Sequence, residues 1–144
     1  MMAFSSDRVI ERIGIGLLER SLPKPEWTHA AHFAAALWLL RHKPDVLERD
    51  GIGSIIRAYN AATGTANTDS SGYHETITAA SMRAAAAFLA SHGGRTPLHI
   101  VANDLLASPF GHSNWLLAYW SGAALFSLTA RRGWLEPDVA PLPF

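Results

Sequence analysis

The stretch from Tyr73 to His92 is rich in alanine, and it constrains the fold more than any other part of the chain. Alanine has the highest helix propensity of all residues, and Gly93 and Gly94 follow directly as a stop signal. We therefore expect one strong α-helix here. No segment of the sequence shows the alternation of apolar and polar residues that is typical of a half-buried β-strand. The sequence predicts an all-α protein.

Further helices are predicted wherever apolar residues recur at intervals of three and four between proline and glycine breaks. Pro25 opens one of them as a first-turn proline, and Pro44 stops it just after His42. Besides 73–92, the expected helices cover residues 5–22, 25–42, 52–63 and 96–107, with two further short helices at 112–119 and 121–132. We expect a single-domain bundle of about five to six helices over residues 1–144, with an extended proline-rich tail at 135–144.

The charge and the lack of cysteine narrow the classes of function. Twelve basic residues balance twelve acidic residues among the 144. Nucleic acid and anionic membranes need an excess or a cluster of Lys and Arg, so neither partner is expected. Without cysteine there is no disulfide and no thiolate ligand, and a metal would have to be held by His, Asp and Glu. We see neither a signal peptide nor an apolar run near the ~18 residues of a membrane span, and expect a cytoplasmic protein.

Three histidines fall on or beside helix faces that are predicted to be buried. Residues three and four apart share one side of a helix, so His29 and His32 lie on the side that Phe33 marks as core-facing. His74 lies at the edge of the apolar face of the alanine-rich helix, in line with Thr78. A buried imidazole needs partners for both of its ring nitrogens. Three such residues in one small core therefore need an explanation.

One explanation is a divalent metal. His29 and His32 would supply two imidazoles from successive turns, and His74 would supply a third from the facing helix, which leaves the open position of a catalytic site. An added carboxylate, from Glu26 or Glu75, would suit zinc, iron or manganese. The protein would then be a small metal-dependent, hydrolase-like enzyme in which metal-activated water attacks a small molecule.

Polar residues near the three histidines are the candidates for catalysis and for ligand binding. Glu75 is the candidate general base, and Tyr73, placed to orient the ligand, is the second catalytic candidate. Thr78, Ser81 and Glu26 are the candidate ligand-binding residues.

The alternative belongs to a different class and needs neither metal nor catalysis. The histidines would form a structural polar network, and Thr78 and Ser81 would line a small-molecule pocket. The five tryptophans and the apolar segment Gly111–Arg132 would support a homodimer. The sequence leaves open whether the protein is an enzyme.

Three motifs carry a resemblance to known sequences. They are Thr28-His29-x-x-His32, the run NTDSSGYHETIT at 67–78, and ARRGWLEPD at 130–138. Together they resemble an uncharacterised family of small bacterial single-domain helical proteins of about this length. The resemblance spans most of the chain. It implies an independent helical domain, and it implies no activity.

Overall fold

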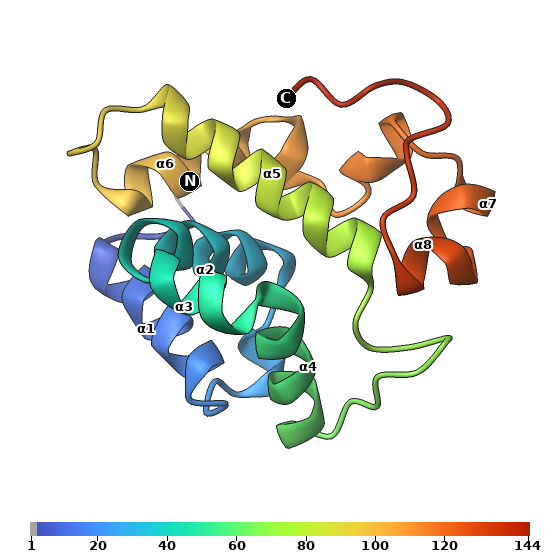
Figure 1. Ribbon diagram of the computed structural model, residues 1–144. Helices are drawn as coiled ribbons and strands as arrows, with labels where there is room; N and C mark the ends of the chain where they lie inside the picture. Colours follow the sequence, from blue (N-terminus) through green and yellow to red (C-terminus); the bar gives the residue numbers. More distant parts are fainter. Residues whose placement is uncertain (1–2) are drawn as a thin grey trace.

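The computed structural model describes residues 3–144, and over this range the regular structure is entirely helical (Figure 1). The α-helices are α1 Asp7–Leu18, α2 His29–His42, α3 Pro44–Asp50, α4 Ile52–Ala62, α5 Glu75–Ser91, α6 Leu98–Ala107, α7 Gly122–Leu125 and α8 Leu128–Arg132. Three short 3₁₀ turns are η1 Lys24–Glu26, η2 Pro109–Gly111 and η3 Trp115–Ala118. The all-α prediction is confirmed. The eight helices of the described range exceed the five to six expected.

Helix α2 is the centre of the fold. Every residue from Phe33 to Leu39 is buried, because this part of the helix is apolar on all sides and has no face that favours water. It packs against α1, α5 and α6. Figure 1 shows α1–α4, in blue to green, gathered on one side of the molecule and α5 with the C-terminal elements on the other. Helix α2 therefore joins the two halves.

The contact between α1 and α2 depends on a glycine. A Cβ atom placed on Gly14 would lie 2.2 Å from Cε3 of Trp38, far inside van der Waals contact. Gly14 lowers the intrinsic helix propensity of α1, but it allows the two helices to approach closely. The packing explains why a predicted weak point of this helix is tolerated.

Two helices begin later than the sequence suggests. Helix α2 starts at His29 rather than Pro25, because Pro25 lies in the separate turn η1 and Thr28 caps the helix by accepting a hydrogen bond from the N–H of Ala31. Helix α5 starts at Glu75, and the residue before it, His74, is the N-cap. The cap residues set these starts, and both caps lie beside the candidate site.

The C-terminal part of the chain is more broken than expected. The helices predicted at 112–119 and 121–132 are replaced by η3, α7 and α8, none longer than five residues. Ser121 and Ser127 each cap a new helix with the side-chain oxygen, which divides the segment into short pieces. No helix in residues 3–144 is long and apolar enough to cross a membrane.

The segment after α8 runs back over α5 without forming a helix. The buried hydroxyl of Thr76 donates to the carbonyl oxygen of Gly133 at 2.8 Å and accepts from the N–H of Leu135 at 3.1 Å. Trp120 donates its indole N–H to the carbonyl oxygen of Leu135, and the carboxylate of Asp138 accepts from Ser121. The bonds of Thr76 fix the C-terminal segment to the start of α5, and those of Trp120 and Ser121 fix it to the residues just before α7.

Candidate functional site

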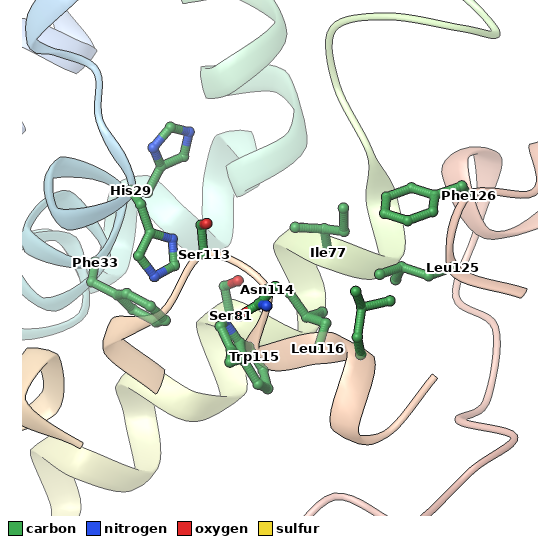
Figure 2. A pocket seen from close by; sticks show the side chains of 12 residues that line it. His29, Phe33, Ile77, Ser81, Ser113, Asn114, Trp115, Leu116, Leu125 and Phe126 are labelled. Carbon is green, nitrogen blue, oxygen red and sulfur yellow. The ribbon is translucent and has the colours of Figure 1, made fainter. Parts of the chain in front are cut away.

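A cleft opens between α2, the first half of α5 and residues 113–126 (Figure 2). It has three parts, with volumes of about 380, 370 and 50 Å³. His32 and Ile77 line all three, so the three parts adjoin one another at these two side chains. We call the first part the apolar pocket, with walls from Phe33, Ile77, Trp115, Leu116 and Leu125. We call the second the polar pocket, with walls from Lys24, Asn60, Thr65, Tyr73, His74 and Thr78.

His32 lies where the parts of the cleft meet. Its Nδ1 donates to the carbonyl oxygen of Thr28 at 2.6 Å, and its ring stacks on Trp27 with a centroid distance of 3.8 Å. The residue is exposed to water in the cleft, although many protein atoms lie around its ring. Desolvation of the ring, opposed by the hydrogen bond to Thr28 and aided by the charges of His29 and Lys24, lowers its pKa to about 4. His32 is therefore neutral at pH 7, with the lone pair on Nε2.

His29 forms one side of the apolar pocket. Its Nε2 donates to the carbonyl oxygen of Phe110 at 3.0 Å, and its ring meets Phe33 edge to face. The side chain is half-buried, and the hydrogen bond fixes it against η2. This is the role that the alternative hypothesis gives it, as part of a polar network around a pocket.

His74 is engaged at both ring nitrogens. Nδ1 accepts from the backbone N–H of Ile77 at 3.1 Å, so the ring proton is on Nε2, which donates to the carbonyl oxygen of Leu125 at 2.7 Å. Burial lowers the pKa of His74, although the bond to Leu125 opposes the shift, and the nearby charge of Arg131 lowers the pKa further. The ring is a neutral connector between α5 and α7.

The arrangement differs from the one that a metal would need. His74 has both ring nitrogens hydrogen-bonded to the backbone, whereas His29 and His32 each use one ring nitrogen for a backbone carbonyl, as metal ligands often do. Within residues 3–144, however, no three His, Cys, Asp or Glu side chains are grouped to hold a metal. The structure therefore does not bring these histidines together with Glu26 or Glu75 as a ligand set. Metal binding stays a prediction, which a measurement of the metal content of the protein would test.

The two catalytic candidates, Tyr73 and Glu75, are hydrogen-bonded to each other. The Tyr73 hydroxyl donates to Oε1 of Glu75 at 2.7 Å, and the guanidinium of Arg57 lies 4.3 Å from the centre of the Tyr73 ring. Desolvation and the neighbouring carboxylate raise the pKa of Tyr73. Tyr73 reaches the wall of the polar pocket, whereas Glu75 lines none of the three parts of the cleft.

The ligand-binding candidates separate into two groups. Thr78 and Ser81 line the cleft, as expected from their line along α5. Glu26 does not line it, because its carboxylate pairs with Arg12 of α1 at 2.7 Å. Since the helix starts only at His29, Glu26 is not on the helical stripe that suggested its role.

Trp115 is the site residue that sequence reasoning missed. It is 5% exposed and lines the apolar pocket. Among the residues described, its indole nitrogen is the one buried side-chain N or O atom without a hydrogen-bond partner. Figure 2 shows the ring between Ser81 and Leu116 in the pocket wall. The five tryptophans look alike in the sequence, and no local pattern marks this one.

No family model matches the chain, and neither a curated protein nor a solved structure shows significant similarity to it. The resemblance to a bacterial family stays a prediction. Any functional conclusion has to come from the cleft itself.

Proposed function

We propose that the protein binds a small, largely apolar molecule in the cleft between α2 and α5. The size supports this, because a pocket of about 380 Å³ is within the range of small-molecule sites. The composition of the walls supports it too. Aromatic and aliphatic side chains dominate the apolar pocket, and a few polar groups, among them Ser81 and Asn114, are placed to orient a ligand.

The observation that carries the proposal is the apolar pocket itself, whose walls include Phe33, Leu116 and Leu125. Trp115 also lines this pocket, and its indole N–H is buried without a partner, which costs about 1–3 kcal/mol. Because the nitrogen is not exposed to the pocket, a ligand acceptor pairs with it only after the indole or a neighbouring side chain moves. A ligand that combines apolar surface with an acceptor, such as a carbonyl oxygen, would remove the cost in this way.

A titration with the neutral, carbonyl-bearing fluorophore prodan tests the proposal. We expect a blue-shifted emission that saturates at one site per chain. Ser81→Leu places an apolar side chain in the cleft and should abolish saturation. Ser54→Leu makes the same change at an exposed position of α4 outside the cleft and should leave binding intact.

Two results would contradict the proposal. One is the absence of saturable binding to the wild-type protein. The other is equal binding by the wild-type protein and by Ser81→Leu, which would place the dye elsewhere on the surface.

A further inference from the structure

Charge is distributed unevenly along the cleft. Within the described residues, the walls of the apolar pocket and of the small third part contain no Asp, Glu, Lys or Arg. The walls of the polar pocket contain one such residue, Lys24. His32, which lies where the parts meet, is neutral at pH 7 because its pKa is about 4. The cleft is therefore apolar at one end and singly positive at the other.

Lys24 is held in place without being neutralised. Its Nζ donates to Oδ1 of Asn60 at 3.1 Å and lies 5.2 Å from the centre of the Tyr59 ring. Among the ion pairs within residues 3–144, none involves Lys24. Asn60 is itself fixed by a hydrogen bond to Asn67. A half-buried ammonium that is positioned by neutral groups keeps its full charge available to a ligand.

Two carboxylates that neighbour residues of the polar pocket along the chain are already paired. Glu26, two residues after Lys24, binds Arg12, and Glu75 accepts from the hydroxyl of Tyr73. Neither lines the cleft, so no acidic side chain of the wall repels an anion. An anionic group that enters the polar pocket meets Lys24 as its charged partner.

We propose that the ligand of the cleft is an amphipathic anion: an apolar molecule with a single carboxylate that pairs with Lys24. The apolar portion lies along Ile77 and His32 into the pocket walled by Phe33 and Trp115. This inference rests on the proposed function, since it specifies the chemical class of the molecule that the cleft binds. An ammonium–carboxylate contact in a partly desolvated site favours the anion over its neutral analogue by about tenfold.

Three probes with the same chain isolate the role of the charge: octanoate, octanol and octylammonium, each titrated against bound prodan. None of the three probes has a carbonyl or ether oxygen along its alkyl chain. Differences between their affinities therefore report on the head group. In the wild-type protein we expect octanoate to bind about tenfold more tightly than octanol, and octylammonium more weakly than both.

Substitutions at Lys24 complete the test. Lys24→Met should remove the preference for octanoate over octanol, while Lys24→Arg should keep the preference. Lys43→Met removes a cation outside the cleft and should behave as the wild type. Circular dichroism of each variant checks the fold. Lys24 is a half-exposed residue of η1, so its substitution leaves the core intact.

The outcomes separate this inference from the proposed function. If prodan binds but octanoate and octanol compete equally, or if Lys24→Met keeps the preference, the cleft is an apolar site and the anion inference is wrong. Tighter binding of octylammonium than of octanoate would also show that the anion inference is wrong. If prodan does not bind at all, the proposed function itself fails, and this inference fails with it.

Discussion

The Nε2 atom of His74 lies 2.7 Å from the carbonyl oxygen of Leu125, a residue 51 positions later in the chain. Nδ1 of the same ring accepts from the N–H of Ile77 and caps α5. One imidazole thus connects the start of α5 to the end of α7. Both nitrogens are hydrogen-bonded to the backbone, so His74 stabilises the walls of the cleft, and its part in a metal site stays a prediction.

The first prediction concerns this residue. His74→Ala removes a helix cap and leaves the Leu125 carbonyl without its donor, which should lower the free energy of unfolding by about 2–4 kcal/mol. Urea denaturation measures the change. His112→Ala, at an exposed histidine, is the matched control and should have little effect.

The same variant tests the metal hypothesis. Plasma mass spectrometry should give the same metal content for the untagged wild-type protein and for His74→Ala. About one equivalent of zinc, iron or manganese that is lost only in His74→Ala would restore the metalloenzyme hypothesis.

The second prediction separates the ring of Trp115 from its N–H. Trp115→Phe keeps an aromatic side chain but removes the unpaired donor, so the ligand-free protein should lose little stability. Prodan, which offers a carbonyl oxygen, should bind about fivefold more weakly to this variant. The related dye N-phenyl-naphthylamine has no carbonyl, and its affinity should not change. An equal loss for both dyes would mean that the substitution only reshapes the pocket.

The third prediction concerns the attachment of the C-terminal segment. Thr76→Val replaces the buried hydroxyl that bonds to Gly133 and Leu135 with a methyl group of similar shape. The change should cost about 2–3 kcal/mol of stability, because one carbonyl and one N–H lose their partner. Amide exchange should accelerate selectively in residues 133–144. Thr129→Val at an exposed position should alter neither quantity, and uniform acceleration across the chain would argue against a local attachment.

The fourth prediction is a dependence of stability on pH. The pKa of His32 is about 4 in the folded protein, against 6.5 for an unperturbed histidine. Between these values the unfolded chain binds more protons at His32, so its contribution to stability is complete above pH 6.5 and is lost as the pH falls toward 4. Urea denaturation across this window should show a smaller pH dependence for His32→Gln. His74, whose pKa is also lowered, should leave a residual dependence in the variant. Identical profiles for both proteins would rule out this role of His32.

The sequence predicts the helices well where propensity and core packing agree. The alanine-rich segment forms α5 within two residues at its start and one at its end, and the apolar stripe of 52–63 forms α4. Prediction was poorest after residue 108. There, Ser127 lies in apolar surroundings that suggest one helix over 121–132, but its hydroxyl bonds to the backbone and starts a new helix.

For the site, the sequence correctly marks α2 and α5 as the facing elements, and places Thr78 and Ser81 at the cleft. It does not give the partners of the histidines. His29 and His74 bind the carbonyl oxygens of Phe110 and Leu125, and a backbone carbonyl has no signature in the sequence. The spacing of His29 and His32 predicts a shared face, but it does not predict the partner of each ring nitrogen. The homodimer stays a prediction.

The bonds of Thr76 have a consequence for the order in which the protein forms. Its partners, Gly133 and Leu135, are 57 and 59 residues away along the chain. Contacts between distant residues are slow to form because a long loop must close first. On the ribosome, α1–α4 emerge and can pack early, whereas the start of α5 has to wait for residues that are synthesised much later. The cleft is therefore expected to be the last part of the molecule to mature, and a newly made chain gains its binding site only when synthesis has passed Leu135.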